Sequence, residues 1–132
     1  MNASESTGRD ALGELIGIEH LDPADADARA RVPVTDDVVQ IHGLVHGGVY
    51  STLAETVCSA ATNAAIREDR RVAFGQSNHT TFLRPISEGH VNAAGRVRHR
   101  GRTTWVWQVD MSDDEGRLSA IAQVVVAVRD RP

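Results

Sequence analysis

The chain has 132 residues, of which 41% are hydrophobic and 24% are charged. These are the proportions of an ordinary globular protein, and the length fits a single domain with one core. The 14 basic residues against 18 acidic ones give a net charge of −4, which argues against a nucleic-acid binder because such proteins carry a basic balance. All the basic residues are arginines, so catalysis by lysine is excluded. The single cysteine excludes an intramolecular disulfide and a cysteine-rich metal site.

Residues 1–10 are polar and are predicted to form a flexible N-terminus, followed by a single domain over residues 11–132. The start of the chain has no apolar stretch of the kind that a secretion signal needs. No run approaches the roughly 18 apolar residues of a membrane span. We therefore expect a cytoplasmic protein with no membrane partner.

The first part of the chain predicts a short helix and a hairpin. Residues 11–18 indicate a short helix that leads into a strand. Residues 28–34 alternate small or apolar residues with arginines, as a half-buried strand does. Residues 22–25 carry the turn signal between the two runs, and a glycine-rich irregular connection follows the second run.

The second part predicts one long helix and four strands. Apolar residues recur at steps of three and four over residues 46–66, which is the period of a helix, and the charged residues 67–71 end it. The strand-like runs that follow, separated by turn signals, are residues 72–82, 90–100, 103–111 and 118–128. Together these elements predict an α+β domain in which one helix covers a face of an antiparallel sheet.

The predicted helix has a single charged side chain, that of Glu55. On a helical wheel its apolar positions fall within an arc of roughly 80°. These positions are Val49, Leu53, Val57, Ala60 and Ala64. Glu55 lies opposite them among small neutral residues, where a surface helix normally carries several charges. These small residues are Ser51, Cys58, Ser59 and Thr62.

This pattern predicts a helix that is covered on both sides, by its own sheet and by a partner subunit or a ligand. A covered carboxylate is costly unless it is paired or used. Glu55 therefore has either a functional role or a structural hydrogen-bonding role.

The start of the helix offers a second chemical element. Gly47 and Gly48 let a ligand approach the backbone, and the N–H groups of a first helical turn have no partner within the helix. Such an end can hold an oxyanion that forms on a carbonyl. Gly47 and Glu55 are about 12 Å apart along a helix that rises 1.5 Å per residue, which is far for one atom to contact both.

Three other patterns favour packing over chemistry. His42 and His46 have the spacing of a metal-binding pair, but the neighbouring glycines make this segment non-helical and no acidic third ligand is placed, so we expect no metal. A thiolate at Cys58 is disfavoured beside a carboxylate, so this residue is expected to be packed. Trp105 and Trp107 alternate and are expected in the core or at an interface, with pocket lining as the second role.

Several segments resemble the hotdog-fold acyl-CoA thioesterases. The sequence HGGVYSTLAE at residues 46–55 resembles the HGG-x6-[D/E] helix of that family, and GQSNHTTFLRP at residues 75–85 resembles the strand after it. Residues 101–105 and 114–118 fit the last two strands, so the resemblance covers about residues 12–129. Because the carboxylate is a glutamate, and because of the residues around Asn78 and Thr104, the chain most resembles the 4-hydroxybenzoyl-CoA thioesterase branch.

The resemblance implies a fold, an activity and an assembly. The fold is one long helix wrapped by a five- or six-stranded antiparallel sheet. The activity is hydrolysis of an aromatic acyl-CoA thioester, 4-hydroxybenzoyl-CoA first of all, to the free acid and coenzyme A. No cofactor is implied, because coenzyme A is part of the substrate. The sites of the family lie at a dimer interface, which implies a homo-oligomer, namely a tetramer built as a dimer of dimers.

The resemblance also implies roles for individual residues. Glu55 would be the nucleophile or general base, and the Gly47 N–H would polarise the thioester carbonyl. Gln40 would orient the carboxylate, the water or the acyl group, and His46 would fix the loop at the site. Ser59 would position water or thiolate one turn after Glu55. Contacts with the substrate and its coenzyme A are implied for His79, Thr80, Thr81, Arg84, His99, Gly101, Arg102, Thr103 and Thr104.

The arginines offer two interpretations. Four of them fall at alternate positions, so those within one strand are expected to share a face that either holds phosphate groups or is merely solvated. These four are Arg96, Arg98, Arg100 and Arg102. Arg129 and Arg131 are looser candidates for the phosphate contacts.

Other functions of the same fold stay open to different degrees. Phenylacetyl and dihydroxynaphthoyl thioesters make the same demands at the reacting carbon as a hydroxybenzoyl thioester. A hydratase of this fold would need a histidine on the helix, and none follows His46 before residue 67. A non-catalytic acyl-CoA-binding module would not need Glu55 and would usually carry a second domain, for which 132 residues leave no room.

Overall fold

The computed structural model describes residues 8–132, so most of the segment expected to be flexible, residues 1–10, lies outside the described residues. The helices are α1 (Ala11–Ile16), α2 (Gly47–Ile66) and the short 3-10 helix η2 (Arg67–Asp69). The strands are β1 (Glu19–Leu21), β2 (Ala28–Pro33), β3 (Arg71–Phe82), β4 (His90–Arg100), β5 (Thr104–Ser112) and β6 (Leu118–Asp130). Each predicted helix and strand is therefore present close to its predicted position.

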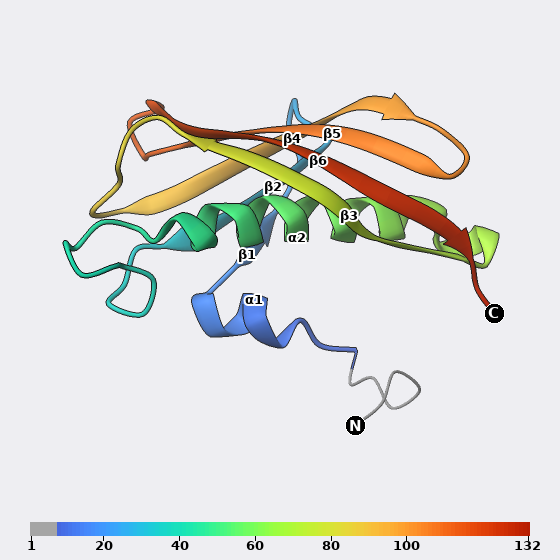
Figure 1. The fold of residues 1–132 in the computed structure, drawn as a ribbon, viewed down its shortest axis with the longest axis horizontal. Helices are drawn as coiled ribbons and strands as arrows, with labels where there is room; N and C mark the ends of the chain where they lie inside the picture. Colours follow the sequence, from blue (N-terminus) through green and yellow to red (C-terminus); the bar gives the residue numbers. More distant parts are fainter. Residues whose placement is uncertain (1–7) are drawn as a thin grey trace.

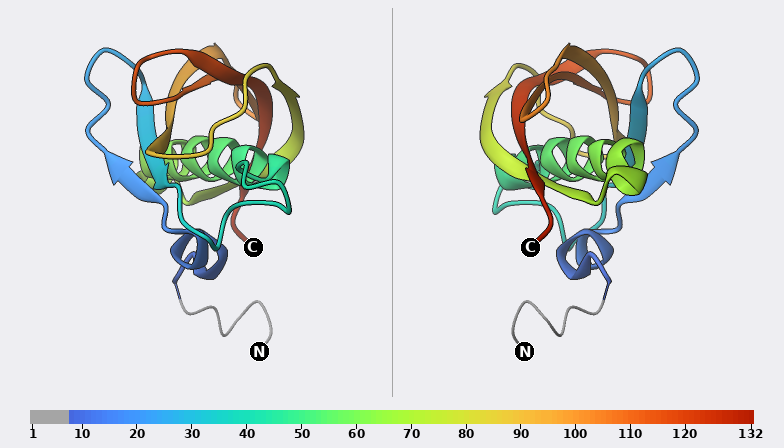
Figure 2. Two further views of the ribbon diagram at one scale, coloured as in Figure 1. Left: turned by 90° about the vertical axis from the view of Figure 1, so that its left-hand side faces the viewer. Right: turned by 90° about the vertical axis from the view of Figure 1, so that its right-hand side faces the viewer.

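The strands form one antiparallel sheet in the order β1-β2-β4-β5-β6-β3. The sheet curves around α2, which lies along its concave side, and α1 lies on the other side of α2 (Figure 1, Figure 2). The expected α+β architecture, one long helix wrapped by an antiparallel sheet, is confirmed with six strands.

The order of the strands differs from their order in the sequence. β3 pairs only with β6, at one edge of the sheet, whereas β4 lies between β2 and β5. The connection over residues 83–89 therefore crosses the sheet instead of closing a hairpin. Alternation of apolar residues determines which face of a strand is buried but not which strand lies beside it. The 12-residue strand β3 is left with one edge that pairs with no strand of the described chain.

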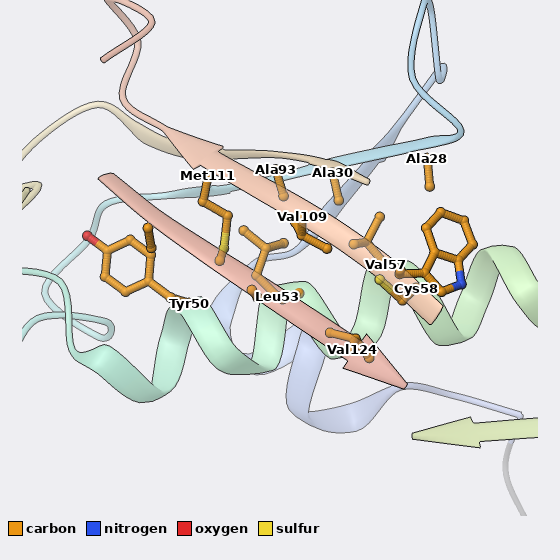
Figure 3. Packing of buried hydrophobic residues seen from close by; sticks show 14 of the residues in the cluster. Ala28, Ala30, Tyr50, Leu53, Val57, Cys58, Ala93, Val109, Met111 and Val124 are labelled. Atoms are coloured by element: carbon orange, nitrogen blue, oxygen red, sulfur yellow. The ribbon is translucent and has the colours of Figure 1, made fainter. Parts of the chain in front are cut away.

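The core lies between α2 and the sheet, where Leu53 and Val57 pack with Val109, Met111 and Val124 (Figure 3). The buried face of α2 is rotated from the predicted one. Ala60 and Ala64 are exposed. The face is completed instead by Tyr50, Ala54, Cys58 and Thr62. Alanine is small and apolar and is tolerated on either face of a helix. Counting Ala60 and Ala64 as core positions therefore moved the centre of the predicted apolar arc away from the face that is buried.

A polar contact inside the core fixes how α2 sits against β5. Trp107 is 1% exposed, and its Nε1–H donates to the Thr62 hydroxyl oxygen at 2.9 Å. That hydroxyl donates to the Cys58 carbonyl oxygen one turn earlier at 2.8 Å. Both buried polar groups are therefore satisfied. Trp105 is 4% exposed, with its ring centroid 6.3 Å from that of Trp107, so core packing of the two tryptophans is confirmed.

Helix α1 is short because both of its ends are capped. The Asp10 carboxylate accepts a hydrogen bond from the Gly13 N–H at 3.0 Å, and Gly17 ends the helix with φ at 87°. Glycine readily adopts that left-handed conformation, which ends the helix. The helix is therefore shorter than the predicted range of residues 11–18. Among residues 8–132, no helix combines the length and the apolarity that crossing a membrane requires.

Candidate active site

The Glu55 side chain lies on the exposed side of α2 and reaches over strand β3 at Gly75. A Cβ atom at position 75 would stand 2.8 Å from Glu55 Cδ and 2.9 Å from Oε2, closer than real contacts allow. Gly75 therefore leaves the space that the carboxyl group occupies. The carboxylate itself makes no hydrogen bond or ion pair within residues 8–132.

Two asparagines tie β3 to α2 on either side of this carboxylate. Asn78 donates from Nδ2 to the Ser51 carbonyl oxygen at 2.9 Å. Asn63 donates from Nδ2 to the carbonyl oxygen of Ala73 at 2.8 Å and accepts from its N–H at 2.9 Å, so it pairs with β3 as another strand would. These contacts fix the position of the edge strand β3 along α2, and the Glu55 side chain lies between the two asparagines.

A hollow of about 270 Å³ opens beside the carboxylate. It is lined by Leu12, Ser51, Thr52, Glu55 and Asn78. Leu12 comes from α1 and supplies an apolar wall, whereas the other lining residues come from α2 and β3. The Asn78 amide is oriented by the Thr80 hydroxyl, which donates to its Oδ1 atom at 2.7 Å.

A second hollow, of about 440 Å³, lies at the start of α2. It is lined by Gln40, Leu44, Val45, Gly47, Tyr50, Phe82, Leu83, Arg84 and Pro85. The structure thus brings together three of the predicted site residues, Gln40, Gly47 and Arg84. They stand in a mainly apolar setting that suits the acyl part of a ligand.

The first turn of α2 presents a free donor in this hollow. The His46 side chain caps the helix, because its Nδ1 atom accepts a hydrogen bond from the Gly48 N–H at 2.9 Å. The Gly47 N–H has no hydrogen-bond partner among the described residues. His46 thus holds the start of α2, and the Gly47 amide, unpaired within the described chain, lies at the positive end of the helix dipole.

The two hollows share no lining residue in one chain. Glu55 and the Gly47 amide are separated by about two turns of α2, or about 12 Å along its axis. Ser59 follows Glu55 by one turn and is half-buried, on the Glu55 side of the helix. A single chain therefore carries both the carboxylate and the Gly47 amide, but the two groups do not meet at one point.

The residues predicted to contact substrate fall into separate places. Arg84 lies in the hollow at the start of α2. His79 and Thr81 face the opposite side of β3 from Asn78 and Thr80, in a hollow with Arg98. The remaining members form the turn between β4 and β5 and its flanks. They are His99, Gly101, Arg102, Thr103 and Thr104.

The expectation that the alternate arginines share a face is wrong. The pairing of β4 with β5 shifts between Val97 and His99, so Arg98 is an extra residue in a bulge. A bulge reverses the alternation of side chains along a strand. Arg96 contacts the loop before β2 through the Asp25 carbonyl oxygen, whereas Arg100 stacks 4.3 Å over the Trp105 ring on the other face.

Cys58 lies beneath the site but is chemically inert. Burial, with the nearby Glu55 carboxylate as a second cause, raises the pKa of the Cys58 thiol well above its usual range. The buried thiol is therefore a packing residue, as predicted, and not a nucleophile. Residues 8–132 also hold no cluster of three or more histidine, cysteine or acidic side chains able to ligate a metal ion.

Two residues of the site, Asn63 and Gly75, were not singled out from the sequence, and Asn78 marked the resemblance without being given a role. The contacts of Gly75 and Asn78 with Glu55 and Ser51 depend on how β3 lies on α2. The signal that could have found them is a glycine inside a strand, which marks a close approach by another group.

Comparison with known proteins identifies the family of the chain. A profile of the thioesterase superfamily matches residues 42–120. PA1618 of Pseudomonas aeruginosa, named an esterase, is 34% identical over 128 residues, which cover 97% of this chain and 86% of that protein. A crystal structure of a variant of the same protein, there called a thioesterase, has a TM-score of 0.87 over 91% of this chain and 86% of the other.

Two further proteins are similar over most of their length. The 1,4-dihydroxy-2-naphthoyl-CoA hydrolase of Listeria monocytogenes is 32% identical and covers 89% of this chain and 95% of its own. The thioesterase SAV0944 of Staphylococcus aureus has structures of two variants, in which a glutamine or a glutamate is replaced by alanine. These are 27% and 28% identical, with TM-scores of 0.85 and 0.84, and cover 90% and 89% of this chain and 98% of theirs.

The family match covers more than half of the chain, and the similarity in sequence and fold extends over most of it. The chain belongs to the thioesterase superfamily.

Proposed function

We propose that the protein hydrolyses an aromatic acyl-CoA thioester, with 4-hydroxybenzoyl-CoA as the leading substrate, to the free acid and coenzyme A. The observation that carries the proposal is a pair of groups on α2 that have no partner among residues 8–132: the Glu55 carboxylate and the Gly47 amide. A thioester hydrolase needs both an anionic attacker or base and a donor for the carbonyl oxygen.

Two copies of the chain are needed to bring these groups together. β3 has an edge that pairs with no strand of the described chain, and such edges pair readily with another strand. In a two-fold dimer whose axis is perpendicular to α2, the two copies of this helix run antiparallel. If the axis passes beside α2 near Ser51, which is midway between Gly47 and Glu55 in sequence, each Gly47 amide lies beside the partner's Glu55. We expect two such dimers to form the tetramer.

The reaction then follows from the charges. The Glu55 carboxylate of one subunit either attacks the thioester carbon or takes a proton from the water that attacks it. Negative charge develops on the carbonyl oxygen, where the Gly47 N–H and the positive end of the α2 dipole stabilise it. The tetrahedral intermediate expels coenzyme A as the thiolate. Where Glu55 has attacked, water hydrolyses the resulting anhydride and regenerates the carboxylate.

Gln40 and Ser59 are proposed to position the reacting groups. Gln40 lies with Gly47 in the hollow at the start of α2, where its amide can contact the acyl group or the water. The glutamine and glutamate replaced in the SAV0944 variants are separated in sequence by the same number of residues as Gln40 and Glu55. This equal spacing supports a joint role for the two side chains. Ser59 would position water or thiolate on the Glu55 side of α2.

The turn between β4 and β5 is proposed to hold the nucleotide of coenzyme A. Arg102 lies in this turn, Arg100 precedes it, and Arg71 and Arg129 donate to its carbonyl oxygens. Arginine matches phosphate oxygens in geometry and charge, so this end of the sheet suits the polyanionic carrier.

The proposal is tested by following thiol release from a panel of acyl-CoA thioesters with a thiol-reactive dye. The panel contains 4-hydroxybenzoyl-, phenylacetyl-, 1,4-dihydroxy-2-naphthoyl- and acetyl-CoA. We expect the aromatic thioesters to have the higher kcat/KM values and 4-hydroxybenzoyl-CoA the highest. The buried Cys58 thiol, whose pKa is raised by burial, is expected to add no background in the native protein.

The dihydroxynaphthoyl thioester is the second candidate, because the Listeria relative is named for that substrate. A higher kcat/KM for this thioester would replace the leading substrate but keep the reaction. Absence of thiol release from every member of the panel would contradict the proposed function itself.

A further inference from the structure

We infer that Arg71 is a positioning residue for coenzyme A, which fixes the turn at residues 101–103 so that its backbone can bind a phosphate group. The inference rests on the proposed function, in which this turn holds the nucleotide. Arg71 begins β3, and the turn lies at the end of the sheet where β3 begins and β6 ends (Figure 1). The sequence offered no reason to single out Arg71.

Arg71 is unusually buried for an arginine at the edge of a sheet. Its side chain is only 16% exposed, and its guanidinium donates from Nη2 to the Arg102 carbonyl oxygen. Its Nε atom is buried without a hydrogen bond, 3.5 Å from the Asp130 carboxylate. Burying an arginine with an unsatisfied donor costs stability. Besides this ion pair with Asp130, the guanidinium forms the hydrogen bond with the turn.

A second arginine holds the adjoining carbonyl. Arg129 on β6 donates from Nη1 to the Thr103 carbonyl oxygen at 2.8 Å, and the Val128 N–H donates to the same oxygen at 2.9 Å. The Gly101 N–H donates to the Thr104 carbonyl oxygen at 2.9 Å and closes the turn. Both carbonyl oxygens of the peptide units after Arg102 and Thr103 are therefore held by the body of the protein.

The orientation of these carbonyls determines where the amides point. In a trans peptide the C=O of one residue and the N–H of the next point in opposite directions, and no cis peptide occurs in the described chain. Because Arg71 holds the Arg102 carbonyl, the Thr103 N–H is directed away from Arg71. The N–H groups of Arg102 and Thr103 have no hydrogen-bond partner among residues 8–132. The Thr103 amide, oriented in this way next to arginine side chains, can donate to a phosphate oxygen.

Loss of the Arg71 contact is expected to weaken binding of the nucleotide without changing the chemical step. A turn that samples several conformations binds with an affinity reduced by the fraction that is competent. We therefore expect Arg71→Gln to raise the KM for 4-hydroxybenzoyl-CoA about tenfold, the effect of losing one charged hydrogen bond, with kcat within about twofold. The same acyl group on N-acetylcysteamine lacks the nucleotide, and its kcat/KM is expected to stay unchanged.

The matched control is Arg29→Gln. Arg29 also donates to a backbone carbonyl, that of Asp22, but at the far edge of the sheet. It is expected to leave KM unchanged for both thioesters. If Arg71→Gln does not fold, as judged by thermal unfolding, Arg129→Gln carries the same test, with the same expected split between the two thioesters.

The outcomes separate the inference from the proposed function. An equal loss for the two thioesters, or an unchanged KM for the coenzyme A thioester, would overturn the role of Arg71 while leaving the hydrolase intact. If the wild-type protein hydrolyses neither thioester, the proposed function fails. Calorimetric titration with coenzyme A then decides the role of Arg71, since about tenfold weaker binding by the variant supports it and equal binding contradicts it.

Discussion

Replacing Glu55 with glutamine is expected to reduce kcat for 4-hydroxybenzoyl-CoA by roughly a thousandfold or more, the scale of losing the general base or nucleophile. Glutamine has the same shape, but its neutral amide can neither attack the thioester carbon nor accept a proton from water. Glu55 makes no hydrogen bond within the described chain and is exposed, so the free energy of unfolding is expected to change by less than about 0.5 kcal/mol. Thiol release and urea unfolding measure the two effects.

The control for this variant is Glu68→Gln, in η2 just beyond the end of α2. It removes the same charge from an exposed position that faces neither hollow, and it is expected to keep full activity. If the Glu55 variant kept most of its turnover, or if the control lost as much as the variant, the assignment of Glu55 as the reacting group would be wrong.

Gly75→Ala is expected to lower kcat about a hundredfold while the protein remains folded, because misplacement by about 1 Å at a reacting centre has effects of that size. The new Cβ would stand 2.8 Å from Glu55 Cδ, so the carboxyl group must move. It sits at the end of a flexible side chain, and Gly75 is not among the glycines with positive φ. The free energy of unfolding is therefore expected to change by less than about 1 kcal/mol.

The neighbouring Gln76→Ala serves as the control for this variant. Gln76 is the extra residue of the bulge in β3 and is exposed, so its truncation is expected to leave both activity and stability near the wild-type values. Full activity of Gly75→Ala would show that the position of the Glu55 carboxylate over β3 does not matter for the reaction. A pronounced loss of stability would show that the glycine is needed for the fold.

The helix and the strands could be predicted from the sequence because their side-chain periods are local properties. Leu53 and Val57 recur at a helical step, and both pack in the core. The lone charge of Glu55 on a helix of small residues could also be recognised, since composition alone sets it apart. The Gly47 amide, which has no partner among residues 8–132, follows from the glycine-rich start of the helix in the same local way, whereas the cap that His46 provides was not predicted.

The remaining features depend on contacts between distant segments. The bulge at Arg98 places Arg96 and Arg100 on opposite faces of β4, and the spacing of these arginines does not predict the bulge. The placement of β3 beside β6 decides that Gly75 lies under Glu55 and that Arg71 reaches the Arg102 carbonyl. Strand order arises from pairing across the whole sheet, so the short-range pattern of residues could not contain it.

The covering expected for the face of α2 around Glu55 is incomplete in a single chain, because Cys58 and Thr62 are buried against its own sheet whereas the Glu55 side chain is exposed. The half-buried Ser51 and Ser59 on the Glu55 side fit a surface that another subunit covers. This is why the proposed site is divided between two protomers, and it makes the assembly part of the chemistry.

The most direct test of that claim is a crystal structure of the Glu55→Gln variant with intact 4-hydroxybenzoyl-CoA. We expect a two-fold dimer in which the thioester oxygen lies about 3 Å from the Gly47 nitrogen of one subunit, as an oxyanion-hole donor requires. The carbonyl carbon is expected to face the substituted side chain at position 55 of the other subunit. A thioester bound far from position 55 of either subunit would contradict the account.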